Sequence, residues 1–324
     1  MKKLLCLSLS GLFLFWTACR RPEKPWKLPN SSGGRLIEAH TGPEYDSVAF
    51  IRLESGEIHK AVRTAWDLVL KPNSGQGTYQ VWLNAALYAF AAPLTETEWQ
   101  ALTDPTQTSS WKCDLADTAA LPPLSPGQVL YFLLDRDRGA VFYRSPTERY
   151  RKVQVRWEGN ILFIRATQLD GSSPVEWQVP VSPDPTYLSL DQNILPSIAP
   201  PWRADFLITR YIHPFYDQPE QFRWYPVLGA LLGEEAEVAI VRSADIPYEN
   251  FGYAQVSGLS FTRKRDAIGY DWKRYDFNTG TYTIDFSRFF VLRTGPTTYY
   301  KLRFIDFYDA QGRKGNVRIE YEPL

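Results

Sequence analysis

Few side chains in this sequence are suited to binding a metal or transferring a proton. The chain has three histidines (His40, His59 and His213), three cysteines, and a single methionine at position 1. His213 lies within the aromatic segment YIHPFY, between Tyr211 and Tyr216. Imidazole and phenolate are both metal ligands, so His213, Tyr211 and Tyr216 are the candidate binding residues. The alternative, and the commoner case, is a structural histidine packed among aromatic rings.

The sequence lacks the motifs that mark common enzyme and metal sites. It contains no GxSxG nucleophile turn, no P-loop and no dinucleotide fingerprint. No CxxC motif or cysteine–histidine cluster offers a metal site, and the carboxylates are scattered singly. We therefore expect a binding or structural protein and not an enzyme.

The N-terminus has the pattern of a targeting segment spanning residues 1–19. Lys2 and Lys3 precede an apolar run from Leu4 to Trp16, and Thr17-Ala18-Cys19 follows. The run is too short for a stable transmembrane anchor. A cysteine at this point resembles a bacterial lipobox, in which the thiol receives fatty acyl chains such as palmitate and becomes the new N-terminus. The sequence thus predicts lipidation of Cys19, with an ordinary signal peptide as the alternative.

The composition restricts both the partners and the means of stabilisation. Lys+Arg and Asp+Glu are equal at 36 each, which gives no charge excess for nucleic acid. After processing, only Cys113 and the lipidated Cys19 would remain, so we expect no internal disulfide and stability from packing alone. Residues 20–45 begin with a Pro-, Ser- and Gly-rich stretch, and we interpret them as a tether.

Alternating apolar and polar residues predict β-structure through most of the remaining chain. In the last run, Val317, Ile319 and Tyr321 alternate with charged residues, which places the apolar groups on one face of a strand. The abundance of aromatic residues and the 24 prolines also suit a β protein with many turns. One short helix is expected at 96–102, because Thr95 and Glu98 form a capping box.

A short internal repeat indicates two related units. Residues 144–153 align without a gap on residues 293–302, and arginine, tyrosine and lysine recur at equal offsets. Lys152 and Lys301 occupy equivalent positions, which suggests a structural role at a turn exit for both. The segments at 65–70 and 204–208 match more weakly.

The predicted fold class is therefore all-β, with two related antiparallel β units packed together. We expect the halves to span about 46–171 and 203–324. A proline-rich crossing at 172–202 would join them, and its interleaved aromatic residues favour an ordered path over the surface.

Several segments resemble those of a known family. They read WDL at 66–68, DFLITRY at 205–211, VLGALL at 227–232, IGYDWKRY at 268–275 and YYKLRF…FYDAQGRKG at 299–315. The chain, from about Asp46 to its end, resembles the HmuY-like lipoproteins of Gram-negative anaerobes. That resemblance implies an all-β, outer-membrane-anchored protein. The founding members are haemophores, which capture haem and pass it to a TonB-dependent receptor.

For this chain the resemblance implies haem or a related porphyrin as the ligand. Haem iron takes axial ligands such as His, Met or Tyr, and the family's haemophores use pairs of His or of Met. Here internal methionine is absent and no family motif places a ligand at any histidine. The propionates or another anion could pair with basic residues near the aromatic clusters, or these residues could be solvated: Arg210, Arg223, Lys273 and Arg274.

The resulting hypothesis is a lipid-anchored outer-membrane protein that binds haem for uptake, on either the periplasmic or the cell-surface face. The alternative is a structural or interaction lipoprotein without a small ligand, docking onto an outer-membrane transporter. The scarcity of histidine and internal methionine motivates that alternative.

Overall fold

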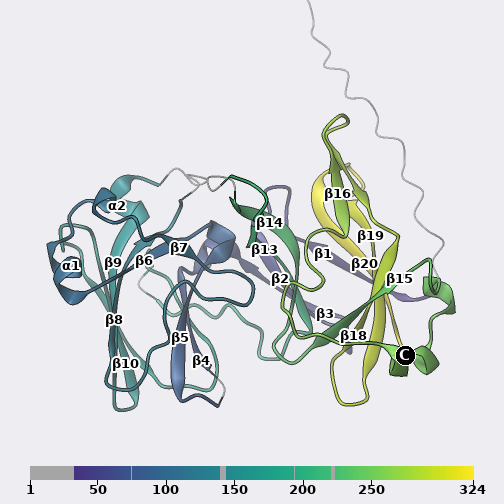
Figure 1. Ribbon diagram of the computed structural model, residues 1–324, viewed down its shortest axis with the longest axis horizontal. Coiled ribbons are helices and arrows are strands. Elements are labelled where there is room, and N and C mark those ends of the chain that lie inside the picture. The colour runs from purple at the N-terminus through teal and green to yellow at the C-terminus, as the bar shows by residue number, and fades with distance from the viewer. Residues whose placement is uncertain (1–32, 74, 139–143, 193, 220–222) are drawn as a thin grey trace, which may run out of the picture.

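The computed structural model describes residues 33–73, 75–138, 144–192, 194–219 and 223–324. Antiparallel strands make up nearly all of its regular structure, which confirms the all-β prediction (Figure 1). The targeting segment with Cys19, the tether up to residue 32, and most of a strand expected at 141–144 lie outside the described residues.

Two units, each a sandwich of two sheets, form the molecule. Unit 1 covers residues 68–190. Its smaller sheet has the strand order β12-β4-β5, and its larger sheet has the order β11-β10-β9-β8-β6-β7. The strands are β4 (Leu68–Asn73), β5 (Thr78–Leu83), β6 (Phe90–Leu94), β7 (Lys112–Cys113), β8 (Val129–Asp135), β9 (Tyr150–Glu158), β10 (Ile161–Thr167), β11 (Val175–Pro180) and β12 (Thr186–Leu188). Its short helices are η2 (Ala85–Leu87), α1 (Glu96–Ala101), η3 (Pro105–Gln107) and α2 (Pro146–Arg149).

Unit 2 combines residues 35–62 with residues 206–323. Its smaller sheet has the order β14-β13-β2-β3, and its larger sheet has the order β1-β20-β19-β18-β15. The strands are β1 (Arg35–His40), β2 (Ser47–Arg52), β3 (Glu57–Val62), β13 (Phe206–Pro214), β14 (Trp224–Leu232), β15 (Glu237–Arg242), β18 (Arg288–Arg293), β19 (Tyr299–Tyr308) and β20 (Lys314–Pro323), with a separate hairpin of β16 (Lys273–Asp276) and β17 (Thr281–Ile284). Helix η1 (Arg63–Ala65) leads into unit 1, and η4 (Tyr248–Asn250) and η5 (Tyr253–Gly258) follow β15.

Each unit buries its own core between its two sheets. In unit 1, Leu68 and Val81 of the smaller sheet pack in one cluster with Phe132 of the larger sheet. In unit 2, Phe206 and Leu302 are buried together in the same way. The alternating pattern of each strand supplies these inward-facing residues, so hydrophobic burial holds each sandwich together.

The two units share strand order and register, apart from the edge strands β7 and β3, which have no counterpart. Leu133 pairs with Lys152 across β8 and β9, and Val291 pairs with Lys301 across β18 and β19. By the same correspondence β1 takes the place of β11, and β2 that of β12. The N-terminal strands therefore complete unit 2, as β11 and β12 complete unit 1.

Each unit has an aspartate at an equivalent position that hydrogen-bonds to the strand completing its smaller sheet. Asp67 is buried and Asp205 is half-buried. Asp67 accepts a hydrogen bond from the backbone N–H of Leu190 at 2.7 Å, and Asp205 accepts one from Leu53 N–H at 2.7 Å. Asp67 directly precedes β4, and Asp205 directly precedes β13, the equivalent strand of unit 2. Each N–H lies two residues beyond the paired residue on the returning strand. The weak sequence match at 65–70 and 204–208 thus marks a shared structural device.

The repeated lysines hold a helix end against the outer face of each larger sheet. Lys152 Nζ donates to the carbonyls of Gln100 (3.4 Å) and Leu102 (3.1 Å), at the end of α1. Lys301 Nζ donates to Tyr248 O (2.9 Å), within the single turn of η4, and to Phe251 O (3.1 Å), directly after it. Lysine suits this position because helix ends leave carbonyls unpaired. The expected structural role is therefore observed, though its partners are helix ends and not turns.

Three boundaries differ from those expected. Arg35–His40, placed in the tether, forms β1 and pairs with β20. The expected halves, 46–171 and 203–324, are not the observed units, because strand pairing sends β1–β3 to the C-terminal unit. The crossing at 172–202 contributes β11 and β12 to unit 1. Sequence periodicity predicts individual strands, but it does not predict which strands pair over long distances in the chain.

Local predictions fared better. Helix α1 spans Glu96–Ala101 and begins with the predicted capping box of Thr95 and Glu98. Along β20, Val317, Ile319 and Tyr321 are buried as expected. The opposite face is not solvated throughout, however, since Glu320 is also buried, against Arg303 at 2.8 Å.

We predict that Asp205 makes the stability of the protein depend on pH. Burial raises the pKa of Asp205 to about 6, from its ordinary value of 3.8. The folded chain then binds this proton more tightly than the unfolded chain. The stabilisation is fully present below about pH 4 and is lost as pH rises to about 6. Asp205→Asn keeps a carbonyl acceptor for Leu53, so it should remove this dependence.

Denaturant unfolding of both proteins between pH 4 and pH 7 measures the effect. The free energy of unfolding of the wild type, relative to that of the variant, should decrease across this range. A constant difference between the two would show that Asp205 does not titrate there.

We also predict that Lys152→Met and Lys301→Met each lower the free energy of unfolding by about 1–3 kcal/mol, because each removes two hydrogen bonds to helix-end carbonyls. The two losses should add, since the lysines lie in different units. Lys60→Met, on the exposed side of β3, is the control. Guanidinium unfolding of the three variants tests this, and losses no larger than that of the control would refute it.

Candidate functional site

The structure separates the candidate binding residues. Tyr211 and His213 lie two residues apart on β13 and share one side of the strand, with ring centroids 6.5 Å apart. Tyr216 lies beyond the strand, where 69% of its surface is exposed, and its ring contacts Trp224. Tyr211 and His213 are therefore together, and Tyr216 is not with them.

The other two histidines are also dispersed. His40 lies exposed on the edge strand β1, with Nε2 3.7 Å from a Glu38 oxygen. His59 lies on β3, where Nε2 is 3.0 Å from Ile198 O and the ring contacts Phe50. No two histidines come together as a ligand pair, and the described residues hold no cluster of three His, Cys, Asp or Glu suited to a metal ion.

His213 is packed among aromatic rings beside a carboxylate. Its ring centroid is 4.8 Å from that of Tyr270 and 5.0 Å from that of Phe215, and Nδ1 is 3.9 Å from an Asp266 oxygen. Burial lowers the pKa of His213 below its ordinary value, and the Asp266 charge opposes that shift. The imidazole is consequently mostly neutral at pH 7.

Tyr211 completes this cluster with a buried hydroxyl. Burial raises the pKa of Tyr211 strongly, and the nearby Asp266 charge adds to the shift. Its Oη faces the turn around Gly269. Within the described part of the chain, neither this oxygen nor His213 Nδ1 has a hydrogen-bond partner.

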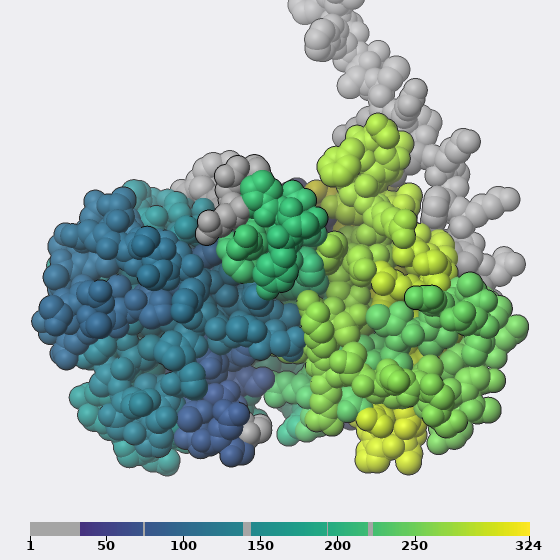
Figure 2. All heavy atoms as spheres, in the orientation of Figure 1, coloured from purple at the N-terminus to yellow at the C-terminus, as the bar shows by residue number. Residues whose placement is uncertain are grey.

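A cleft of about 180 Å³ lies between the two units, and Tyr211 of this cluster forms part of its lining. Its walls are the outer faces of the two smaller sheets, and the surface is visibly hollowed where the units part (Figure 2). The lining is mainly apolar and aromatic and includes Val48, Phe50, Trp66, Val69, Trp82, Tyr187, Leu207 and Leu231. Such a concave, mostly apolar site with a few polar groups is typical of ligand binding.

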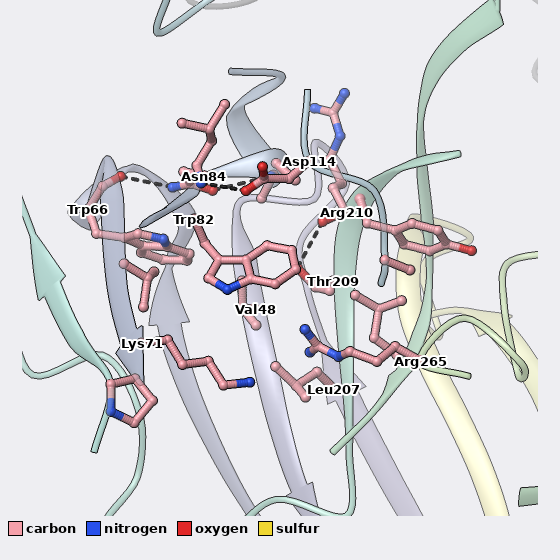
Figure 3. A pocket seen from close by; sticks show the side chains of 18 of the residues that line it. Val48, Trp66, Lys71, Trp82, Asn84, Asp114, Leu207, Thr209, Arg210 and Arg265 are labelled. Atoms are coloured by element: carbon pink, nitrogen blue, oxygen red, sulfur yellow. Dashed lines mark hydrogen bonds between the residues drawn. The ribbon is translucent and has the colours of Figure 1, made fainter. Parts of the chain in front are cut away.

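The indole of Trp82 extends across the middle of this cleft (Figure 3). Trp66 stands beside it and packs edge-on against Tyr187, with ring centroids 5.8 Å apart. Trp82 Nε1 is buried, and no hydrogen-bond partner for it is found in the described residues. The aromatic walls thus present both a flat ring and an unused N–H donor.

Two cations border the indole. Lys71 and Arg265 approach from opposite sides below Trp82 (Figure 3). Lys71 Nζ pairs with Glu234 Oε1 at 2.8 Å, which links unit 1 to unit 2. Arg265 Nε donates to Leu232 O at 3.3 Å, and among the described residues its guanidinium has no carboxylate partner. An anion in the cleft would therefore meet positive charge.

Asp114 forms part of the cleft wall as a structural group. It is buried and accepts hydrogen bonds from the backbone N–H groups of Leu83 and Ala120. Burial raises the pKa of Asp114 to about 7. Burial also raises the pKa of the neighbouring Cys113 thiol to about 12, so this cysteine is unreactive at neutral pH.

The basic residues singled out in the sequence do not line the cleft with their charges. Arg210 contributes to the lining, but its guanidinium points away from the centre (Figure 3). Lys273 is buried in unit 2 and donates to Leu228 O at 2.6 Å. Arg274 is exposed and pairs with Asp285. Arg223 directly precedes β14 and is not part of the cleft lining.

Sequence reasoning missed Lys71, Trp82 and Arg265 as site residues. The segments that hold Trp66 and Trp82 are apolar or alternating in sequence, which predicts strands but does not distinguish an outward-facing cleft wall from a core. Only the packing of two units places these residues opposite Leu207 and Arg265.

The fold and the cleft define a duplicated β-sandwich protein with an aromatic, cation-bordered site between its units. The chain belongs to the HmuY family, whose profile, described as HmuY protein, matches residues 44–321. This confirms the resemblance found in the sequence. Comparison with curated proteins found no match.

Solved structures include two similar proteins. Apo PinO from Porphyromonas gingivitis has 11% identity and a TM-score of 0.26, with 90% of this chain and 96% of that chain covered. The apo HmuY analogue TFO from Tannerella forsythia has 9% identity and a TM-score of 0.27, with 92% and 98% covered. At these scores the superpositions carry no further argument. No helix within the described residues is long and apolar enough to cross a bilayer.

We predict that the Asp266 and Lys264 charges tune the pKa of His213 in opposite directions. The Asp266 carboxylate raises it and the Lys264 ammonium lowers it. Asp266→Asn should therefore move the His213 titration to lower pH, and Lys264→Met should move it to higher pH. NMR titration of the imidazole measures both. Equal midpoints in all three proteins would mean that the ring is not in contact with this pair.

Proposed function

We propose that this protein is a non-enzymatic binding protein that captures haem or a related porphyrin for uptake. Membership of the HmuY family over residues 44–321 is the observation that carries the proposal. The cleft between the units supports it, because aromatic walls suit the faces of a macrocycle and Lys71 and Arg265 suit its acid groups.

The cleft residues fit the porphyrin ring better than they fit its iron. Of the side-chain types that ligate haem iron, the lining contains only Tyr187 and Tyr211 and lacks His, Met and Cys among its described residues. The Tyr211 hydroxyl is turned toward the Gly269 turn. Burial raises the pKa of Tyr187 to about 12, which disfavours its phenolate. The structure therefore offers no ready axial ligand in the cleft.

The size of the cleft limits how much of a porphyrin it can enclose. Pockets that enclose drug-sized ligands measure roughly 300–1,000 Å³, and a cavity of about 150 Å³ accommodates benzene. At about 180 Å³ the cleft would hold one edge of a porphyrin. The remaining rings would lie in solvent, or the units would part at the Lys71–Glu234 ion pair.

The location and the partner are part of the same proposal. Acylation at Cys19 would anchor the protein to the outer membrane, on its periplasmic or cell-surface face. The captured ligand would then pass to a TonB-dependent receptor, in keeping with the family's founding members. Mass spectrometry of the purified native protein would show the acylated Cys19.

Exposed aromatic residues favour one alternative, an interaction protein without a small ligand. The end of β13–β14 and the β16–β17 hairpin form neighbouring projections on the same side of the molecule (Figure 2). They expose Tyr216, Tyr225, Tyr275 and Phe277, the last with 90% of its surface exposed. Such patches mark protein contacts. Affinity capture from membranes that recovers no specific outer-membrane transporter would count against this alternative.

A haemin titration tests the proposed function directly. We expect residues 20–324 to bind one equivalent of haemin with a saturable shift of the Soret band. The shift should lack the spectrum of a bis-histidine complex, because no two histidines lie together. A chain that leaves the Soret band unchanged in both iron oxidation states is not a haem-binding protein.

A further inference from the structure

We infer that the cleft is a site for a flat aromatic acid, recognised by Trp82, Lys71 and Arg265 and not by metal ligation. The inference rests on the proposed function for the identity of the ligand as a porphyrin. The recognition by ring stacking and positive charge is inferred from the cleft residues alone.

The two cleft walls are equivalent sheets of the duplicated units. Equal register makes Tyr187 the counterpart of Phe50, and Val69 the counterpart of Leu207. These pairs are conservative and build two apolar walls that face each other.

Two equivalent pairs depart from this symmetry. Trp82 stands where unit 2 has Leu231, and Lys71 stands where unit 2 has Thr209. All four residues line the cleft. Packing two apolar sheets together requires neither a half-buried indole nor a lysine. The departures therefore concentrate stacking and charge on the unit 1 wall.

The geometry of these groups defines the ligand. A ring stacked on Trp82 would place an acid substituent between Lys71 and Arg265, which approach from opposite sides (Figure 3). The Arg265 guanidinium is available for this role, since its described side-chain hydrogen bond is to the carbonyl of Leu232, and the Asp117 carboxylate accepts from the Arg265 backbone N–H instead. Trp82 Nε1 adds a donor for an oxygen at the ring edge. The ligand class is thus a planar aromatic with a carboxylate or sulfonate.

Metal ligation has no place in this arrangement. The His213 ring packs against Phe215 and Tyr270, has 27% of its side chain exposed, and is not part of the cleft lining. The iron of a haem would therefore contribute little to affinity. Haemin and metal-free protoporphyrin IX should bind with dissociation constants within about threefold of one another.

The test uses haemin, metal-free protoporphyrin IX and the fluorescent probe anilinonaphthalene sulfonate, each titrated into residues 20–324. The variants W82L and K71T copy the equivalent residues of unit 2, so both should fold in their strands. The control is F277L, which changes an exposed aromatic residue. H213A and Y211F remove the candidate metal ligands and test for metal ligation. Thermal unfolding verifies that each variant folds.

We expect W82L and K71T each to weaken binding of all three probes about 10-fold or more, as loss of a stacking surface or a charged hydrogen bond implies. F277L should bind like the wild type, and H213A and Y211F should leave the ratio of haemin affinity to metal-free porphyrin affinity unchanged. E234Q separates recognition from simple bridging between the units. It frees Lys71 and removes a negative charge, so affinity should increase, whereas a purely structural ion pair would make E234Q and K71T behave alike.

The outcomes distinguish the inference from the proposed function. If no porphyrin binds but the naphthalene probe does, in a manner dependent on Trp82 and Lys71, the porphyrin function fails and the recognition chemistry stands. If haemin binds more than about 10-fold more tightly than the metal-free ring, and H213A or Y211F abolishes that preference, metal ligation governs the site. That result overturns the inference, as does probe binding that W82L and K71T leave unchanged.

Discussion

The pairing of the N-terminal strands with the C-terminal unit is the constraint on which the structure depends. β1 pairs with β20, and β2 pairs with β13, so the chain returns to its beginning to complete its last sandwich. β4 pairs with β5 and β13 pairs with β14, so each strand has one edge that only a distant segment, β12 or β2, covers. Asp67 and Asp205 secure those segments through single backbone hydrogen bonds. Without this return, β13 would be an unprotected edge and Val48 and Phe50 would be missing from the cleft.

Duplication of the unit explains how a cleft arises from packing alone. The two smaller sheets turn equivalent outer faces toward one another, and their twist lets them touch only partly. Cores are filled by each unit separately, so residues on the facing walls are free to differ. Trp82 and Lys71 differ most from their counterparts, and the contact between the units leaves them partly accessible. The stability of the sandwich and the chemistry of the cleft are in this way carried by opposite faces of the same sheets.

The charged groups of the protein divide into those that hold the fold and those that face solvent in the cleft. Lys152, Lys301 and Lys273 are buried and donate to backbone carbonyls. Burying a cation is costly unless its donors are satisfied, and each of these lysines meets that need with main-chain oxygen. Lys71 and Arg265 are only half-buried and remain available to a ligand. A basic residue near an aromatic cluster in the sequence is thus no guide to which of these roles it plays.

The amino-acid sequence by itself determined the strands, the capped helix α1, the repeat around Lys152 and Lys301, and membership of the HmuY family. These follow from period-two burial, local hydrogen bonding and motif identity, all of which act over a few residues. Tertiary structure alone decided that residues 35–62 belong to unit 2, that His213 packs against aromatic rings outside the cleft lining, and that Trp82, Lys71 and Arg265 converge. Long-range strand pairing fixes those outcomes, and pairing depends on the complementarity of whole sheet faces, which no short segment of the chain encodes.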